Sequence, residues 1–249
     1  MIIIKNEREI ALMKESGRLV GETLNMIQTH VRPGISTWAL DKICEEFIMS
    51  RGAYPSFKNY NGFPGSICAS VNEVVIHGIP SKDILLKEGD IISVDCGAVL
   101  NGFHGDAART FRVGDVSTEA DRLIRITEES FFKGIEFAKV DQRLGDISYA
   151  VQQHIESNGL SVVRDFTGHG IGRDLHEGPS IPNYGVAHRG PKLRAGMALA
   201  IEPMVNLGTY HVKVMEDNWT TVTRDGKLSA HYENTVIITE DGPVITTLV

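Results

Sequence analysis

Two stretches of this chain resemble each other, and the likeness limits what the chain can fold into. LKEGDIISVD (86–95) aligns with LRAGMALAIE (193–202). In each, a leucine is followed three residues later by glycine, then by an apolar run, and a carboxylate stands six residues after the glycine. These carboxylates are Asp95 and Glu202. Two αβ halves that face each other would bring them together at a pseudo-twofold axis.

The segments before the two stretches also correspond. Each half has an expected helix that ends at glycine, at Gly52 and at Gly159. A histidine beside glycine and proline follows, His77 in IHGIP and His176 in LHEGP. We interpret the pattern as a diverged duplication; two unrelated strands with similar turns are the alternative. Sites commonly form where two such units meet.

Composition narrows the class of protein. With 249 residues, 42% of them hydrophobic, the chain can bury a sizeable core. A net charge of -7 argues against a nucleic-acid partner. Three widely spaced cysteines favour a reducing compartment over a disulfide framework. The apolar start is too short for a signal peptide, and no stretch could span a bilayer. We therefore expect a cytoplasmic protein with no membrane association.

Local signals predict the main elements. Asn6 with Glu9 forms a capping box for a first helix, and VRPG (31–34) ends it. Further helices are expected at about 36–51, 118–137 and 146–158, a strand at 74–80, and an irregular wall over 54–72.

Asn101-Gly102 lies between two β-rich runs, which is the strongest short signal for a β-hairpin. A two-residue turn there places Asp95 opposite Ala108, with Asp106 on the same face and diagonal to Asp95. Diagonal neighbours lie within roughly 7–8 Å, a distance that a shared cation can bridge. Two solvated surface acids, or one acid paired with Arg109, are the alternatives.

Two more acids lie in or beside buried-looking strands, Glu202 in ALAIEPM and Glu233 in AHYENTVII. Few basic residues occur in the same strands, so cations explain the four acids better than ion pairs do. Oxygen ligands with one imidazole, from His169, suit a pair of divalent ions such as Mn, Fe, Co or Zn.

The glycines around His169 also suggest a phosphate-binding loop. That motif needs G-x-G-x-x-G after a strand and before a helix. Here the spacing is G-x-G-x-G, and RDLHEGPSIP with two prolines follows. We therefore exclude the phosphate loop and assign the glycines to the close approach of His169.

These residues together resemble a known family. SVDCGA, HGDAARTF, GHGIGRDLHEGP, IEPM and HYENTV are similar to the motifs of the pita-bread metallopeptidases over nearly the whole chain. The short chain without an extra N-terminal domain, the segment NGFPGSICASVNEVVIHGIP (61–80), and only 32 residues between His169 and Glu202 resemble the type I methionine aminopeptidases. The resemblance implies an α+β pita-bread fold in one catalytic domain, 1–249, with halves at about 1–115 and 116–249 and a curved antiparallel central sheet backed by helices.

The resemblance also implies a set of site residues. Its five metal ligands correspond to Asp95, Asp106, His169, Glu202 and Glu233, which would hold two divalent ions (Co, Mn, Fe or Zn) bridged by a hydroxide. Glu202 would also accept a proton from the water. His176 would hydrogen-bond the carbonyl oxygen or the tetrahedral intermediate, and His77 would contact the scissile amide and assist the leaving group.

A methionine-sized pocket is implied as well, since a thioether packs well against aromatic rings. Its wall would include Tyr60, Phe63, Cys68, His77 and Trp219. Phe57 and Leu175 depart from the residues that many bacterial members carry. Asn72, Val74 and Ser229 match a monovalent-cation site, for Na⁺ or K⁺.

The implied activity is removal of the initiator methionine from nascent chains whose second residue is small. The partners would be nascent N-termini and the ribosome, and the enzyme would be a monomer. Another exopeptidase or amidinohydrolase of the same fold, and a binding protein that keeps the fold without catalysis, are the alternatives.

Overall fold

The computed structural model describes residues 1–249 as four long helices and a set of antiparallel strands. In chain order the elements are α1 (Glu7–Gln28), α2 (Thr37–Ser50), β1 (Tyr54–Pro55), η1 (Tyr60–Gly62), β2 (Ile67–Val71), β3 (Val74–Ile76), β4 (Ile91–Leu100), β5 (Phe103–Arg112), α3 (Thr118–Ile135), α4 (Leu144–Ser157), β6 (Ser161–Val162), β7 (Thr167–Gly170), β8 (Glu177–Pro182), β9 (Ala198–Ile201), β10 (Met204–Asn206), β11 (Val212–Val214), β12 (Thr221–Thr223), β13 (Ser229–His231), β14 (Asn234–Thr239) and β15 (Gly242–Ile245).

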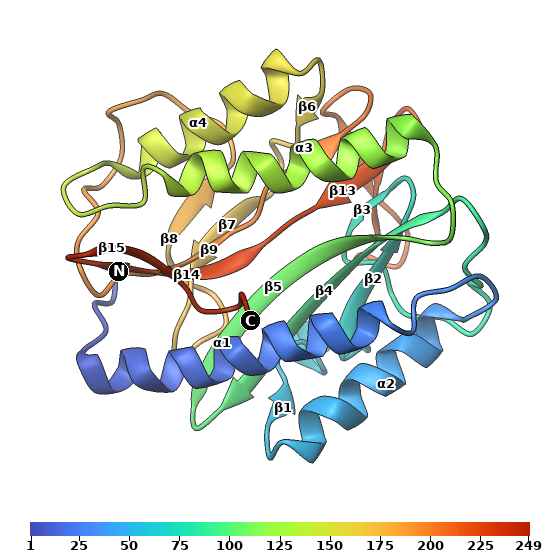
Figure 1. Ribbon diagram of the computed structural model, residues 1–249, viewed down its shortest axis with the longest axis horizontal. Coiled ribbons are helices and arrows are strands. Elements are labelled where there is room, and N and C mark those ends of the chain that lie inside the picture. The colour runs from blue at the N-terminus through green and yellow to red at the C-terminus, as the bar shows by residue number, and fades with distance from the viewer.

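Each half contributes a three-stranded antiparallel unit to the centre of the molecule. In the first unit β4 pairs with β2 and β5, and in the second β9 pairs with β7 and β14. Backbone hydrogen bonds join β5 to the start of β14, because Ala108 and Glu233 donate N–H groups to each other's carbonyls at 3.3 and 3.0 Å. The two units therefore meet along a β5–β14 seam (Figure 1).

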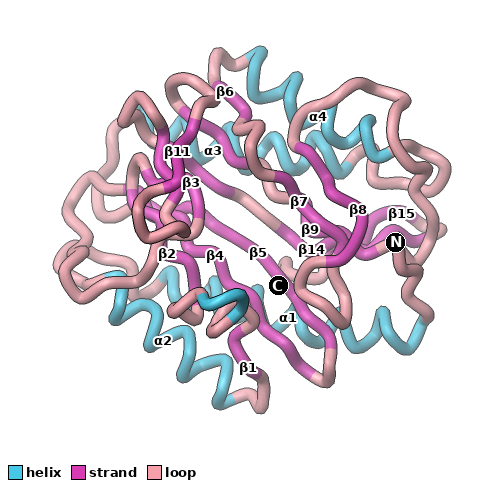
Figure 2. Tube along the Cα trace, turned by 180° about the vertical axis from the view of Figure 1, so that it is seen from behind, coloured by secondary structure: helices cyan, strands magenta, loops and turns pink.

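The four helices cover one face of this sheet. In Figure 1, α1 and α2 lie over the first unit, and α3 and α4 over the second. Leu24, Leu40 and Ile92 belong to the buried core of the first half, and Leu123 and Ile155 to that of the second. The opposite face is formed by strands and loops (Figure 2). This arrangement agrees with the predicted α+β architecture, in which helices back an antiparallel sheet.

The predicted helix starts are largely confirmed. Asn6 and Glu9 form the capping box of α1, and the Ser36 side chain caps α2. The fourth helix begins at Leu144, two residues before the predicted start. There the Asp146 carboxylate accepts a hydrogen bond from the Arg143 backbone N–H at 2.8 Å, so arginine occupies a position where cap-forming side chains are usual. None of the helices is long and apolar enough to cross a bilayer.

The predicted hairpin is confirmed in its register. Asn101 and Gly102 have φ angles of 53° and 80°, as a type I′ turn requires. Asp95 pairs with Ala108, and Asp106 lies two residues away on the same strand. The face shared by the two acids therefore follows from the turn alone.

The expectation of an irregular wall over 54–72 is wrong for its last part. Ile67–Val71 forms β2 and pairs with five consecutive residues of β4. Pro64, Gly65 and Ser66 precede it and are typical of a loop. The strand has only five residues, and its stability comes from pairing with β4. The rest, including η1, is loop, turn and the two-residue β1.

Candidate active site

The β4–β5 hairpin presents two buried acids on one face. Asp106 lies opposite Gly97, one diagonal step from the Asp95–Ala108 pair. Asp106 is 4% exposed, and the Oδ1 atoms of both aspartates are buried without a hydrogen-bond partner. The alternative of solvated surface acids is therefore wrong.

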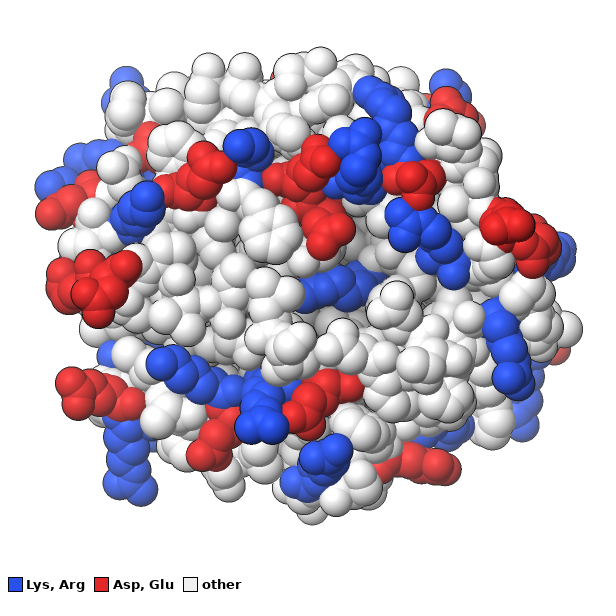
Figure 3. Space-filling view, viewed as in Figure 1, with Lys and Arg blue, Asp and Glu red and all other residues white.

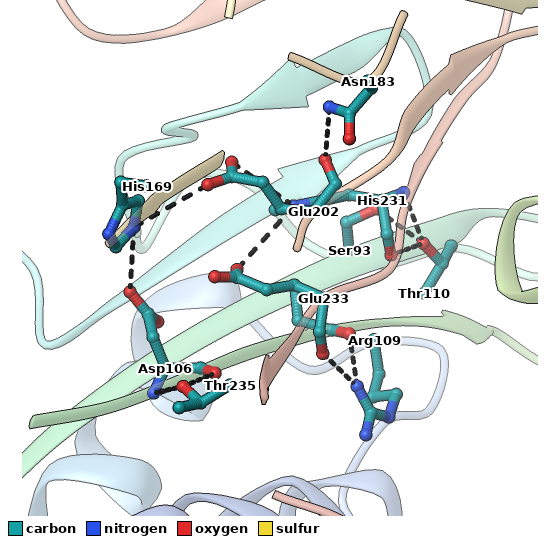
Figure 4. A network of polar contacts seen from close by, with 11 residues as sticks. Ser93, Asp106, Arg109, Thr110, His169, Asn183, Glu202, His231, Glu233 and Thr235 are labelled. Atoms are coloured by element: carbon teal, nitrogen blue, oxygen red, sulfur yellow. Dashed lines mark hydrogen bonds and ion pairs between the residues drawn. The ribbon is translucent and has the colours of Figure 1, made fainter. Parts of the chain in front are cut away.

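Three side chains from the second half face this pair across the seam. His169 lies on β7, Glu202 directly follows β9, and Glu233 directly precedes β14. All five candidate ligands line one cavity. Figure 4 shows His169 pointing toward both Asp106 and Glu202, with the Glu233 carboxyl group below that of Glu202. We call Asp95, Asp106, His169, Glu202 and Glu233 the ligand cluster.

Distances within the ligand cluster suit shared cations. His169 Nε2 lies 3.8 Å from Asp106 Oδ2 and 3.7 Å from Glu202 Oε1. One ligand atom each from Asp106, His169 and Glu233 lie within 4.8 Å of one another. Asp95 and Glu202 line the same cavity outside this closest trio. The set is wider than one ion needs, as expected if two ions share it.

The local backbone prepares His169 as a ligand. Its Nδ1 lies 2.9 Å from the carbonyl oxygen of Gly170, which makes Nδ1 the protonated nitrogen and leaves the Nε2 lone pair free. Burial lowers the pKa of His169 to about 3, so the ring is neutral at physiological pH.

The flanking glycines are there for close packing. A Cβ at Gly168 would lie 2.3 Å from the Ala200 carbonyl oxygen, and one at Gly170 would lie 2.1 Å from that of Gly178. The glycine-rich stretch forms strand β7 and no helix follows it. The exclusion of a phosphate loop is therefore confirmed.

Electrostatics favour cations in the ligand cluster. Burial raises the pKa of Asp95 to about 7. Burial first, and then the neighbouring acids, raise the pKa of Asp106 and Glu233 well above their ordinary values, and burial with the charge of Asp95 does the same for Glu202. Four buried carboxyl groups cannot all ionise without compensation. With one neutral imidazole beside them, divalent cations fit this donor set.

Arg109 does not compensate these acids by a direct ion pair. Its guanidinium donates to the backbone carbonyl oxygens of Ala108 and Glu233 and to the side-chain oxygen of Asn234. Neighbouring residues of a strand point to opposite faces, so Arg109 lies behind the sheet when Ala108 faces the cavity. The alternative of an acid paired with Arg109 is wrong.

His231 belongs to this site and was not predicted. It is 1% exposed, and its Nε2 has no hydrogen-bond partner. That atom lies 4.0 Å from Glu202 Oε2 and 3.8 Å from Glu233 Oε2. Burial lowers the pKa of His231 to about 3. His231 ends β13 and Glu233 directly precedes β14, and this spacing of two residues was the available signal.

The two predicted catalytic histidines line the same cavity. The ring of His176 lies 4.2 Å from that of His169, between centroids. The Nδ1 of His176 lies 2.8 Å from the Tyr60 hydroxyl, which fixes the ring from behind. His77 has a φ of 59°, uncommon for a residue with a side chain, and burial lowers its pKa to about 4. Both are therefore held as neutral rings beside the ligand cluster.

An apolar recess continues from the ligand cluster, and we call it the substrate pocket. The cavity as a whole measures about 200 Å³. The rings of Phe63 and Trp219 meet edge to face at 5.1 Å. The cavity lining includes all the predicted wall residues, which are Tyr60, Phe63, Cys68, His77 and Trp219. Phe57 and Leu175 also line it, as does Asn61, which was not predicted.

The three predicted monovalent-cation residues, Asn72, Val74 and Ser229, are not among those that line the cavity of the ligand cluster. The Ser229 N–H donates to the Asn72 carbonyl oxygen at 2.9 Å. The Asn72 side chain bonds Asp90 and the Ile91 N–H. Val74 pairs with β12. The structure thus brings Asn72 and Ser229 into contact.

A buried cluster of four acids and one imidazole between two facing αβ units is typical of metal-dependent hydrolases. Comparisons with known proteins assign the chain to the same class. The family model described as "Metallopeptidase family M24" matches residues 11–240. The chain is 65% identical to a methionine aminopeptidase of Clostridium perfringens and 55% identical to methionine aminopeptidase 1 of Bacillus subtilis, over 100% of both chains in each case. It superposes on a methionine aminopeptidase structure from Rickettsia prowazekii with a TM-score of 0.98, at 46% identity over 100% of both chains.

The chain belongs to metallopeptidase family M24 and, within it, to the methionine aminopeptidases. The predicted pita-bread fold is confirmed by the same likeness. Membership implies an enzyme that uses divalent metal ions, and the ligand cluster is a candidate place for them.

Proposed function

We propose that this enzyme removes the initiator methionine from newly made proteins whose second residue is small. The observation that carries the proposal is the substrate pocket, a recess with apolar and aromatic walls that would suit a methionine side chain and that opens onto the ligand cluster. The 65% identity to a methionine aminopeptidase over the whole chain supports the same substrate.

The five residues of the ligand cluster would hold two divalent ions. Asp106 and Glu233, whose atoms approach those of His169 most closely, would be shared between them. Asp95 would complete one site, and His169 with Glu202 the other. Such ions would supply Lewis acidity toward the scissile carbonyl and lower the pKa of a nucleophilic water. The metal would be Co, Mn, Fe or Zn.

The protein's own groups would handle protons and developing charge. Glu202, whose pKa burial raises well above its ordinary value, would accept a proton from the attacking water. The Tyr60 hydroxyl can donate to His176 Nδ1, which places the ring proton on Nε2, where it would stabilise the negative carbonyl oxygen. His77, on the first half, would contact the scissile amide and assist the leaving group.

Methionine recognition would come from the walls of the substrate pocket. Phe63 and Trp219 meet edge to face and offer ring edges and faces to a thioether. Tyr60, Cys68 and His77 would complete the wall.

Further features of the reaction's setting belong to the same proposal. Asn72, Val74 and Ser229 would offer oxygen atoms to a Na⁺ or K⁺ ion. The enzyme would act as one catalytic domain and a monomer in the cytoplasm, on nascent N-termini at the ribosome, without binding nucleic acid itself.

Turnover of a Met-Ala-Ser peptide, compared with an X-Pro dipeptide, tests the proposed activity. We expect methionine release that depends on added metal, and no turnover of the X-Pro dipeptide. Hydrolysis of X-Pro without release of methionine would assign another exopeptidase activity. The Asp106→Ala and Glu233→Ala variants serve as controls; if both kept their metal content and activity, the assignment of the ligand cluster would be wrong.

A further inference from the structure

A second cavity, lined in part by Arg109, lies on the helical face behind the sheet, and we call it the rear cavity. It measures about 510 Å³ and lies between α1 and α3, over the end of β5 and Tyr232. Figure 3 shows the helical face hollowed between these helices, with basic atoms at the bottom of the hollow. This volume is in the range of small-molecule sites.

Arg109 gives the rear cavity a partly buried positive charge. Its guanidinium lies 4.2 Å from the centre of the Tyr232 ring. Its three hydrogen bonds go to two backbone carbonyls and one amide oxygen, and it forms no ion pair. A guanidinium has five N–H donors, so two remain for another acceptor. Burial lowers the pKa of Arg109, as expected for a charge without a carboxylate partner.

Two more arginines line the rear cavity, Arg112 from β5 and Arg125 from α3. Each is about half exposed and already pairs with an acid outside the cavity lining, Asp121 and Glu129. Glu128 is the one acid in the lining, so three cations face one anion.

Surface ion pairs of this kind contribute little to stability. The two arginines can therefore turn toward a ligand at small cost.

We propose that the rear cavity binds the oxyanion of a small organic phosphate or carboxylate. The fixed donors of Arg109 would contact it at the floor, and Arg112 and Arg125 would close on it from the rim. Arginine is suited to this task because its planar fork matches phosphate and carboxylate oxygens. The apolar wall, which includes Phe111 and Ile124, would contact the organic part.

The rear cavity adjoins the active site through one side chain. The Arg109 guanidinium lines the floor of the rear cavity and also donates a hydrogen bond to the Glu233 backbone carbonyl oxygen at 2.5 Å. Figure 4 shows this contact at the backbone end of Glu233, below and to the right of its carboxyl group. A ligand in the rear cavity would therefore lie one residue away from the ligand cluster.

Calorimetric titration of the metal-loaded enzyme tests the proposal. The probes are inorganic phosphate, glycerol 3-phosphate and succinate, each at constant ionic strength. We expect saturable binding of the phosphates, of succinate, or of both, and the comparison identifies which oxyanion the cavity prefers. The Arg109→Gln variant and the double variant Arg112→Gln/Arg125→Gln should each weaken that binding by about tenfold or more, from the loss of charged hydrogen bonds.

The second variant keeps the contact between Arg109 and Glu233, so it separates ligand binding from damage to β14. Lys14→Gln is the matched control, because Lys14 is an exposed cation on α1 outside the cavity lining; its binding should equal that of the parent protein. If no probe bound, or if binding were unchanged in both arginine variants and thus belonged to the metal centre, the proposal would be overturned.

Discussion

In the proposed metal site, the carboxyl group of Asp106 would destabilise the metal-free protein and would be required for metal binding. It is 4% exposed and its pKa is raised by burial and by Asp95 and Glu202. We expect Asp106→Asn to lower metal content and to reduce kcat/KM by more than about 100-fold. This exceeds the loss that follows mutation of residues that only hydrogen-bond a metal ligand. The same variant should raise the melting temperature of the metal-free protein, because one mutually repelling acid is gone.

Elemental analysis, peptide turnover and thermal melting with chelator measure the three effects. Asp115→Asn, an exposed aspartate after β5, is the matched control and should change none of them. A lower melting temperature for the metal-free Asp106→Asn protein would contradict the account of strain in the ligand cluster.

Tyr60 offers a test of how His176 is positioned. Its hydroxyl lies 2.8 Å from His176 Nδ1. The Tyr60→Phe change keeps the ring and removes the hydroxyl, so we expect kcat to fall by about fivefold, the value of one neutral hydrogen bond, with little change in KM or metal content. Tyr54→Phe, at a tyrosine that is 67% exposed, should leave kcat unchanged. A rise in KM with constant kcat would instead show that the Tyr60 hydroxyl acts in substrate binding and not in positioning His176.

Single residues differ in how far the sequence could place them. The positions of Asp95 and Asp106 followed from a two-residue turn, because the side-chain period of a strand is fixed. His231 lies beside Glu202 and Glu233, but the sequence did not distinguish it from an ordinary core histidine. For Arg109 the sequence analysis left open an ion pair with an acid, although strand alternation places its side chain opposite to that of Ala108.

At the scale of elements, the contact of α1 with β5 depends on Gly105, which packs against the backbone of Gly17. A Cβ at Gly105 would lie 2.8 Å from the backbone N and Cα of Gly17. We expect Gly105→Ala to cost about 2 kcal/mol of folding free energy, as overpacking in a close contact does. Urea denaturation of the metal-loaded protein measures it.

The control is Gly185→Ala, where the nearest atom to the new Cβ would be a Ser148 side-chain carbon at 3.3 Å. It should cost much less. Equal losses in the two variants would mean that the α1–β5 approach is not what demands glycine at Gly105.

Elements were predictable where local chemistry decides them. The caps at Asn6 and Ser36 and the turn at Asn101-Gly102 act over a few residues, so the sequence showed them. β2 was missed because its five residues gain their stability from β4, which is remote in the chain. The start of α4 was missed because a side chain within the helix, that of Asp146, replaces the usual cap.

At the scale of the whole molecule, the site exists only because two similar units face each other. β4 and β5 of the first half supply Asp95 and Asp106, and the second half supplies His169, Glu202 and Glu233. The seam between β5 and β14 fixes how these two sets approach. Repulsion among the acids thus acts between the halves, so metal ions in the ligand cluster should hold the halves together.

Repulsion among the buried acids makes the stability of the metal-free protein depend on pH. The pKa of Asp95 rises from 3.8 to about 7 on folding, so the folded state binds a proton that the unfolded chain has released. Stability must then fall as pH rises through the folded pKa. The buried histidines act in the opposite direction around 6.5, their ordinary pKa, and become nearly all neutral in both states only about one pH unit above it. The window from about pH 7.5 to about 8, below the range where thiols titrate, therefore isolates the acids, to which Asp106, Glu202 and Glu233 contribute with Asp95.

Urea denaturation across that window, with chelator and with added Mn²⁺, makes the measurement. With chelator the free energy of unfolding should decrease steadily from about pH 7.5 to about 8. With Mn²⁺ it should be larger and nearly constant, because bound cations keep the carboxyl groups ionised in the folded state as they are in the unfolded one. Asp106→Asn should reduce the slope seen with chelator. A chelated protein as stable at the upper end of the window as at the lower end would show that the halves tolerate four ionised acids without metal.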